Sequence, residues 1–293
     1  MVNNMPYLIA VDNGHGMETA GKRSPAIPEA WFGKKKGECI HEKEFNKPAA
    51  DYLIAALKRC GFNVINVSPG DTDISLTARY TAANNAKADI FVSKHYNAYK
   101  GTWGSSNGIE TIVHQGCSAD TKRLAQCVQD ELIQTHGRTN RGVKTDLQQS
   151  GINIAVLRNT NMPAILTESG FMDNLLEAKT MLDPEFQRAD AEATCRGICK
   201  YFGVTYKAVN VKLMPKGDIK RNSPKEDIMW LQEKLNKAVP DCQYAPLKVD
   251  GIFTPKVRIA VLSYWESRGW KQDGKDTGWI VGSGTREALA KYS

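Results

Sequence analysis

The 293-residue sequence lacks any run of 18 apolar residues, so it contains no candidate membrane-spanning helix. It also lacks repeats of solenoid period and low-complexity tracts, which excludes a repeat architecture. Its first residues, MVNNMPYLIAVDNG, show no basic stretch followed by an apolar segment and a small-residue cleavage site. We therefore expect a protein that is made in the cytoplasm without a signal peptide and is not inserted into a membrane.

Cysteine pairs of the CxxC type are also missing. The seven cysteines are scattered and odd in number, so a disulfide framework is not expected. Cys195 and Cys199 are spaced i, i+4 on a predicted helix. We expect them to be buried small apolar side chains rather than metal ligands.

A basic face of the kind that binds nucleic acid is likewise absent. The formal net charge is +7, yet the excess is concentrated in residues 206–221, YKAVNVKLMPKGDIKR, with five basic side chains and one acidic side chain. These cations lie in a connector rather than on a folded face with interleaved aromatic residues. No nucleic-acid partner is therefore expected.

The sequence does contain an alternation of strand and helix signals over its first 203 residues. Short apolar runs predict strands, namely YLIAV, FNVINV, ADIFVS, GIETIVH and PAILTE, with helical segments between most of them. This alternation predicts an α/β fold, an open and mostly parallel twisted sheet with helices on both faces. We place this domain at residues 1–205, a basic linker at 206–222 and a small, mainly helical domain at 223–293.

Several residues are predicted to cap helices, because short polar side chains at a first turn accept hydrogen bonds from free N–H groups. The predicted N-terminal caps are Asn174 and Ser223, each with a glutamate three residues later, together with Asp183, Thr254 and Thr285. The first long helix shows its apolar face from Lys47 onward. We expect Pro48 in its first turn, where proline is tolerated.

Two histidines and a glutamate follow or end predicted strands. His15 follows the strand YLIAV by a turn in which it stands between two glycines. His95 lies at the end of ADIFVSKH, and Glu168 lies at the end of PAILTE. Because ligands bind beyond the carboxyl ends of the strands in an open parallel sheet, we expect these three side chains to converge.

Imidazoles and a carboxylate are the ligands that a catalytic zinc ion takes from a protein, with one position left for water. A second carboxylate is needed as general base, and Glu42, at the start of the first long helix, can supply it. The residue types alone leave open which carboxylate has which task. Each of these residues, taken singly, is also compatible with a hydrogen-bonded structural role.

Four segments, in order, resemble the motifs of one enzyme family. VDNGHG is similar to the DPGHG motif of zinc-dependent N-acetylmuramoyl-L-alanine amidases (amidase type 3), a family that includes phage endolysins and bacterial autolysins. HEKEFNKPAADYLIAALKRCGFNV resembles the family's glutamate–lysine segment, and SLTARYTAANNAKADIFVSKHYNA resembles its second histidine block. MPAILTESGFMDN is similar to the catalytic glutamate block, and together the matches cover residues 5–203.

The resemblance implies that residues 1–205 are a zinc amidase domain. His15, Glu42 and His95 would bind one zinc ion, and Glu168 would be the catalytic acid/base. The implied reaction uses zinc-activated water to hydrolyse the amide bond between the lactyl group of N-acetylmuramic acid and L-alanine of the stem peptide. Asn13 stands where the family usually has proline, a change that concerns turn rigidity rather than metal binding.

Other acids and histidines do not match the family's ligand positions. Glu44 lies two residues from Glu42, but Glu42 precedes the lysine and keeps the family's spacing. His41, His114 and His136 match no ligand position and are expected to be ordinary structural or surface residues.

The polar loop at residues 18–38, ETAGKRSPAIPEAWFGKKKGE, lies between the first two implied ligands. Two interpretations are equally open, namely one wall of the substrate groove and a mobile surface loop. The sequence does not identify individual substrate-binding residues.

Residues 223–293 are similar to the peptidoglycan-binding helical domain that is built from two half-repeats. LQEKLN, VDGIF and VRIAV resemble the first half-repeat, and VGSGTREAL resembles the second. The resemblance implies a domain that targets the cell wall. The alternative is a helical module that only stabilises or dimerises the protein.

Bacterial peptidoglycan is the implied partner and substrate. With no signal peptide expected, the enzyme would act on the cell wall after release, and a separate pore-forming partner is one route for that release. Two alternative functions remain open: a zinc peptidase that cuts a stem or cross-bridge peptide bond, and a non-catalytic wall-binding protein.

Overall fold

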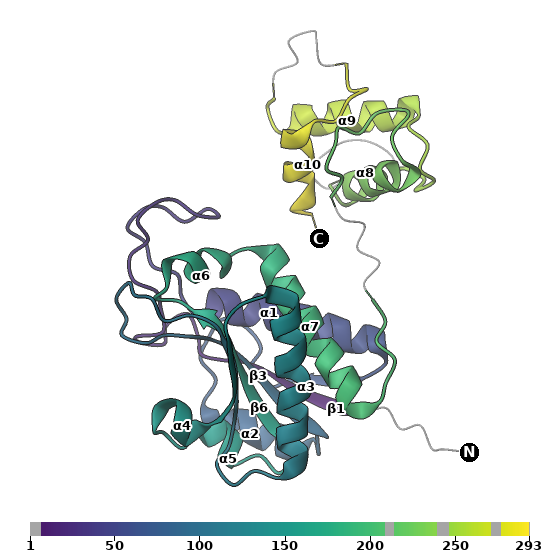
Figure 1. Ribbon diagram of the computed structural model, residues 1–293. Helices are drawn as coiled ribbons and strands as arrows, with labels where there is room; N and C mark the ends of the chain where they lie inside the picture. The colour runs from purple at the N-terminus through teal and green to yellow at the C-terminus, as the bar shows by residue number, and fades with distance from the viewer. Residues whose placement is uncertain (1–6, 209–213, 239–245, 271–276, 293) are drawn as a thin grey trace, which may run out of the picture. The chain divides into compact units, whose positions relative to one another are not determined.

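The computed structural model comprises two compact units, residues 1–208 and 209–293 (Figure 1). Each unit has a hydrophobic core of its own. The described residues are 7–208, 214–238, 246–270 and 277–292. The predicted linker at 206–222 therefore lies only partly within the described residues, and Cys242 lies outside them.

The first unit is built on a six-stranded sheet with the strand order β2-β1-β3-β6-β4-β5. Its strands are β1 (Leu8–Asn13), β2 (Asn63–Asn66), β3 (Ile90–Asn97), β4 (Ile109–Val113), β5 (Asn140–Thr145) and β6 (Ala164–Phe171). Neighbouring strands run parallel except for β4 and β6, which pair antiparallel. The sheet is therefore mostly parallel, as predicted, and β5 is an edge strand that the sequence did not reveal.

Helices cover both faces of this sheet, as predicted (Figure 1). On one face lie α1 (Lys43–Cys60), α3 (Ala119–His136) and α7 (Pro184–Phe202), and on the other lie α2 (Leu76–Asn85) and α5 (Ala155–Arg158). The short helices are α4 (Asp146–Ser150) and α6 (Leu175–Thr180). Side chains alternate along β1, so Ile9 and Val11 join the first core while Ala10 joins the second.

Helix α1 begins at Lys43, earlier than predicted, and this moves Pro48 out of the first turn. A proline inside a helix cannot donate to the carbonyl four residues before it, which here belongs to Glu44. The side-chain amide of Gln187 on α7 donates to that carbonyl instead, at 3.1 Å. The orphaned acceptor is thereby satisfied, and the helix continues through the proline.

Two of the candidate site residues lie inside strands rather than at strand ends, contrary to the prediction. Strand β3 continues two residues beyond His95, and β6 continues three residues beyond Glu168. The register of β3 and β6 shifts between His95 and Asn97. The two side chains still lie near the carboxyl ends of neighbouring parallel strands.

The second unit is mainly helical, as predicted. Its described residues contain α8 (Lys225–Lys237), α9 (Pro255–Ser267) and α10 (Ser283–Ala290). Apolar side chains on α8 and α9 are buried in one core, namely Ile228, Leu231, Leu235, Val257, Val261, Tyr264 and Trp265.

Three of the predicted caps are confirmed. Asn174, Asp183 and Thr254 each accept a hydrogen bond from a backbone N–H in the first turn of the helix that follows. The capping box at Asn174 is only half formed. The carboxylate of Glu177 accepts from the backbone N–H of Gly108 rather than returning a bond to the cap.

Two predicted caps are wrong. Pro224 is the N-cap residue of α8, and the hydroxyl of Ser223 accepts from the N–H of Lys220 instead of capping the helix. Thr285 lies within α10, and its hydroxyl accepts from the indole N–H of Trp265 at 2.9 Å. In both places a tertiary or turn partner competes successfully for the hydroxyl.

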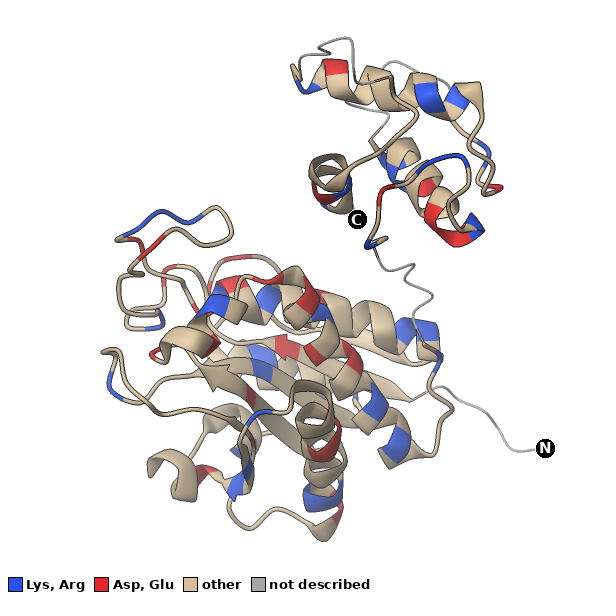
Figure 2. Cartoon of the chain, turned by 45° about the horizontal axis from the view of Figure 1, so that its top comes forward, with Lys and Arg blue, Asp and Glu red and all other residues tan. Residues whose placement is uncertain are grey.

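The six described cysteines are free thiols, and Cys195 and Cys199 are buried, as predicted. Acidic and basic residues are interspersed along the helices of both units (Figure 2). Among the described residues, no helix combines the length and the apolar character needed to cross a bilayer.

Candidate active site

The turn after β1 holds His15 in a left-handed backbone conformation, with a φ of 60°. Such a conformation is uncommon for a residue other than glycine and needs support from neighbouring groups. The buried ammonium of Lys43 donates to the carbonyl oxygens of His15 (2.8 Å) and Asn13 (3.2 Å), and also to the side-chain oxygen of Asn13. Lys43 therefore fixes the turn that presents the imidazole.

The glycines on either side of His15 are required by close approach of other groups. A Cβ atom at Gly14 would overlap the imidazole of His95, and one at Gly16 would overlap the backbone of Asp73. Only glycine leaves room for these contacts. The group that lies closest to Gly14 in this turn is therefore the imidazole of His95.

Glu42 is the N-cap residue of α1, and it is almost completely buried. Its Oε1 accepts hydrogen bonds from the Asn46 side-chain amide (3.1 Å) and the Tyr96 backbone N–H (3.2 Å), and lies 2.8 Å from Nδ1 of His95. Its Oε2 lies 3.4 Å from Nε2 of His15. The protein thus holds one carboxylate oxygen, while the other faces His15.

Strands β3 and β6 bring His95 and Glu168 together as direct neighbours across the parallel pair. The His95 ring meets the His15 ring edge-on, with ring centroids 4.8 Å apart. The carboxyl group of Glu168 is buried, and its Oε2 has no hydrogen-bond partner among the described residues. A buried oxygen without a partner is costly, so this atom is available to a ligand.

His15, Glu42 and His95 form one group of potential ligand atoms that all lie within 4.8 Å of one another. Two imidazoles and one carboxylate are a typical donor set for catalytic zinc, whereas magnesium and calcium prefer oxygen ligands. The spacing and the donor chemistry therefore fit a zinc ion, with Glu168 beside it.

The remaining histidines and the neighbouring acid lie elsewhere. Glu44 forms an ion pair with Lys34, with Oε2 and Nζ 2.9 Å apart. His41, His114 and His136 belong to neither group of potential metal-ligating residues found in the described chain.

The two glutamates of the site differ strongly in acidity. Burial raises the pKa of Glu168 well above its usual range, and the negative charge of Glu42 raises it further. Burial would also raise the pKa of Glu42, but the hydrogen bond from His95 and the charges of both histidines lower it to about 2. Burial lowers the pKa of His15 to about 4. Neighbouring carboxyl groups with separated pKa values are typical of a site where one carboxylate stays ionised and the other exchanges a proton.

A buried ion pair supports the turn from below. The carboxylate of Asp12 on β1 accepts hydrogen bonds from Ser93 on β3 (2.5 Å) and from the guanidinium of Arg79 on α2 (3.0 Å). The same guanidinium donates to Asp73 at 2.5 Å. These contacts tie β1, β3 and α2 together beneath the candidate donors, and such outer contacts keep metal ligands in place.

A cavity of about 820 Å³ opens over the site and includes His15, Glu42, His95 and Glu168 among its lining residues. Its size is ordinary for a small-molecule or peptide pocket. The beginning of the 18–38 loop also lines it, through Thr19, Gly21 and Lys22. Further along, Ile27 and Trp31 of the same loop pack in a buried cluster.

The residues that orient the donors were not predicted from the sequence. Asn46 follows Glu42 by one helical turn, and this i, i+4 spacing is a signal for a side-chain hydrogen bond. Lys43, Asp12 and Arg79 carry no comparable signal, because their partners lie on other elements.

Comparisons with known proteins give relatives over the same part of the chain. Residues 9–200 match the family model of N-acetylmuramoyl-L-alanine amidase. The N-acetylmuramoyl-L-alanine amidase CwlM of Bacillus licheniformis is 28% identical over 200 residues, covering 68% of this chain and 70% of CwlM. The endolysin of Bacillus phage SPP1 is 30% identical over 269 residues, covering 88% of this chain and 90% of the endolysin.

Solved structures give the same result. An N-acetylmuramoyl-L-alanine amidase from Clostridium difficile 630 matches with a TM-score of 0.57 and 32% identity, covering 68% of this chain and 97% of that one. The catalytic domain of the amidase CwlV from Bacillus (Paenibacillus) polymyxa var. colistinus matches with a TM-score of 0.57 and 30% identity, covering 68% and 99%. With sequence, fold and site in agreement, the chain belongs to the N-acetylmuramoyl-L-alanine amidase family and is a hydrolase of cell-wall peptidoglycan.

Proposed function

We propose that His15, Glu42 and His95 hold a single zinc ion and that Glu168 is the catalytic acid/base of amide hydrolysis. One observation carries the proposal, namely three donor side chains within 4.8 Å of one another beside a buried oxygen of Glu168 that lacks a partner. The family is generally zinc-dependent, which supports the choice of ion.

The bond to be broken joins the lactyl group of N-acetylmuramic acid to L-alanine of the stem peptide. Water attacks an amide slowly, and the departing nitrogen needs a proton, so both a base and an acid are required. A bound zinc ion supplies a Lewis acid and lowers the pKa of water. Glu168 accepts the proton of the attacking water and delivers it to the departing nitrogen.

The other residues of the site orient these groups. Asn46 and the backbone N–H of Tyr96 engage Oε1 of Glu42, which leaves Oε2 directed toward His15. Lys43 fixes the turn of His15. Fixed donors lose little freedom when an ion binds, and this favours tight binding.

Metal content and turnover of purified variants test these roles. His15→Ala is expected to lose zinc and turnover together, whereas Glu168→Gln keeps zinc and loses turnover. His114→Ala is the matched control, because His114 is neither one of the proposed ligands nor a residue that lines the cavity. An active Glu168→Gln enzyme would remove that residue from its role.

The cleaved bond is identified by the new amino termini in digested peptidoglycan. The amidase exposes L-alanine. New termini at any other residue would indicate a zinc peptidase instead.

We further propose that the second unit targets the enzyme to the cell wall. The match to the phage SPP1 endolysin covers 88% of the chain, which is more than residues 1–208 can supply, so it extends into this unit. Several large apolar side chains of the unit are exposed, namely Ile252, Ile259, Trp270 and Ile280.

Removal of the second unit tests its role. Residues 1–208 correspond to solved amidase chains that consist almost entirely of this domain, so the fragment is expected to fold. It should hydrolyse soluble muropeptides as the full chain does but sediment poorly with whole walls. Equal sedimentation of the fragment and the full chain would contradict a targeting role.

The similarity to the same endolysin also suggests how the enzyme reaches the cell wall. We infer that the enzyme acts on the wall after release, with a separate pore-forming protein as its route. Lysis of cells that express the chain with and without a pore-forming protein tests this. Equally fast lysis without the pore would contradict the proposed route.

A further inference from the structure

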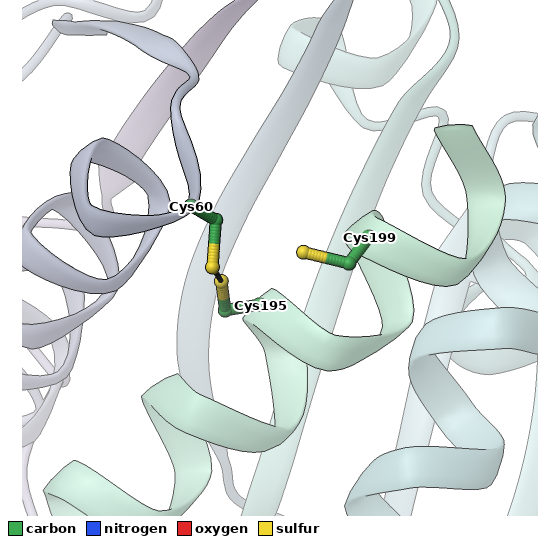
Figure 3. Close-up of side chains that lie close together, drawn as sticks. All are labelled: Cys60, Cys195 and Cys199. Atoms are coloured by element: carbon green, nitrogen blue, oxygen red, sulfur yellow. Dashed lines mark hydrogen bonds between the residues drawn. The ribbon is translucent and has the colours of Figure 1, made fainter. Parts of the chain in front are cut away.

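Three cysteines from distant parts of the sequence meet inside the first unit (Figure 3). Cys60 is the last residue of α1, and Cys195 and Cys199 lie one turn apart on α7. Sγ of Cys60 and Sγ of Cys195 are 3.7 Å apart, and the three sulfur atoms all lie within 4.8 Å of one another. Figure 3 shows the Cys199 side chain directed toward the other two.

All three cysteines are buried in the main core of the unit. The predicted role of small apolar side chains explains the burial of Cys195 and Cys199. It does not explain why a third thiol, from another helix, lies against them. Sulfur atoms arranged in this way are a donor set for a soft metal ion.

We propose that Cys60, Cys195 and Cys199 form a second metal site, a structural thiolate site for a zinc ion, separate from the catalytic centre. Nothing in the amidase reaction uses these residues, since none of them lines the cavity over His15 and Glu42.

The spacing of the sulfur atoms fits the size of such an ion. A Zn–S bond is about 2.3 Å long, so two sulfur atoms on one tetrahedral zinc ion lie about 3.8 Å apart. The distance of 3.7 Å between Cys60 and Cys195 already has this value. Cys199 needs only a small side-chain adjustment, because its sulfur lies within 4.8 Å of both.

The backbone of Lys207 completes the surroundings of the site. Its N–H donates to Sγ of Cys60 at 3.4 Å, a contact that stabilises negative charge on sulfur. Its carbonyl oxygen lies 3.8 Å from the same sulfur, in position to serve as the fourth ligand. Structural zinc sites are almost always four-coordinate, so a fourth donor is required.

The net charge of a zinc ion bound by three thiolates is small. Three thiols each release a proton when the ion binds, so the site has a net charge of −1. The guanidinium of Arg59, the residue before Cys60, lies beside the site: it donates to the carbonyl of Lys207 at 2.8 Å and to the carboxylate of Glu192 at 2.5 Å.

The site would join three segments of the unit. Cys60 ends α1, Cys195 and Cys199 lie on α7, and Lys207 belongs to the last residues of the unit. A metal ion here would fix the end of the catalytic unit to its core. Such an ion stabilises the folded state, because the site does not exist in the unfolded chain.

Cobalt substitution in the full-length protein tests the proposal. Because the sulfur atoms are enclosed, the ion must enter during folding, so the protein is expressed in medium that contains Co²⁺ in place of zinc. Cobalt bound by thiolates gives a sulfur-to-metal charge-transfer band in the near ultraviolet. Cobalt bound by imidazoles and a carboxylate gives no such band, so the readout is independent of the catalytic centre.

We expect the wild-type protein to show the charge-transfer band and to contain two metal ions per chain. Cys195→Ser should lose the band and one of the two ions, unfold at a lower temperature and still hydrolyse peptidoglycan. Cys127→Ser is the matched control, because Cys127 is a free thiol outside the cluster, and it should keep both ions.

Two results would overturn the proposal. One is a wild-type protein without the band, and the other is a band that persists in Cys195→Ser. Cys195→Ala provides a second variant in case the serine hydroxyl prevents folding in the core, and its remaining activity reports that the chain is folded.

Discussion

The first unit contains two groups of three potential metal-ligating side chains that are built in different ways. His15, Glu42 and His95 lie under an open cavity, while the three cysteines lie in the apolar core. Hydrogen bonds from Asn46, Tyr96 and Lys43 hold the first group. The cysteines are held mainly by the packing of α1 against α7.

The difference between the two groups matches the different requirements of a catalytic ion and a structural ion. A catalytic ion needs an open position for water and substrate, so its ligands must be fixed by bonds that do not fill the space around it. A structural ion needs enclosure and no open position. Substitutions should therefore affect turnover at the first group and stability at the second.

The largest effect is expected from exchanging the carboxylate of the proposed zinc site. Glu42→Gln should lose zinc and lower turnover by more than the roughly 100-fold that loss of an outer contact costs. Glu44→Gln, two residues away, should change neither, because the carboxylate of Glu44 is engaged by Lys34 and by the His41 backbone N–H. Metal analysis and hydrolysis of purified peptidoglycan measure both. Equal losses in the two variants would show that the ligand had been assigned to the wrong residue.

A smaller effect is expected from removing a group that orients the ligand. Asn46→Leu removes the hydrogen bond to Oε1 of Glu42 and should lower zinc affinity or turnover by roughly 10–100-fold. Asn84→Leu is the control, since Asn84 is another helix asparagine, and its side chain bonds to the backbone of Asn159 and Asn161 rather than to a site residue. Unchanged zinc affinity and turnover in Asn46→Leu would mean that packing alone positions Glu42.

The smallest effect on turnover is expected at a buried histidine outside both groups, where the change should affect stability instead. Burial lowers the pKa of His136 from 6.5 to about 4, although Asp190 opposes the shift and Arg138, Lys94 and Arg196 add to it. The unfolded chain therefore binds a proton as the pH falls below 6.5, while the folded chain does not. Stability should fall by up to about 3 kcal/mol between pH 6.5 and pH 4 on this account.

His136→Phe keeps the ring contact with Phe186 but removes the titrating group. Its free energy of unfolding should depend less on pH over this range than that of the wild-type protein. Urea unfolding at several pH values measures the two slopes. Parallel slopes would mean that other groups carry the pH dependence.

Much of the fold follows from local patterns in the sequence. The apolar runs at β1, β3 and β6, and the cap of α7 at Asp183, are found where they were expected. Strand β5 was not predicted, because its sequence NRGVKT is polar and its side chains are at most half-buried at the sheet edge. The antiparallel pairing of β4 with β6 has no local signal either, since it depends on which strands meet.

In the candidate site, too, some features have a local signal in the sequence and others depend on the three-dimensional fold. His15, Glu42, His95 and Glu168 were predicted from short motifs, and the fold brings all four to one cavity. The motifs could not show what holds these residues. The role of Lys43 depends on a turn some thirty residues away, so it becomes visible only in three dimensions.

The hydrogen bonds from Lys43 to the turn of His15 have a consequence for how the proposed zinc site should respond to a chelator. Because bonds within the chain hold this turn, its shape should not depend on a bound ion. Activity lost on removal of the ion should then return when zinc is added back, without refolding of the chain.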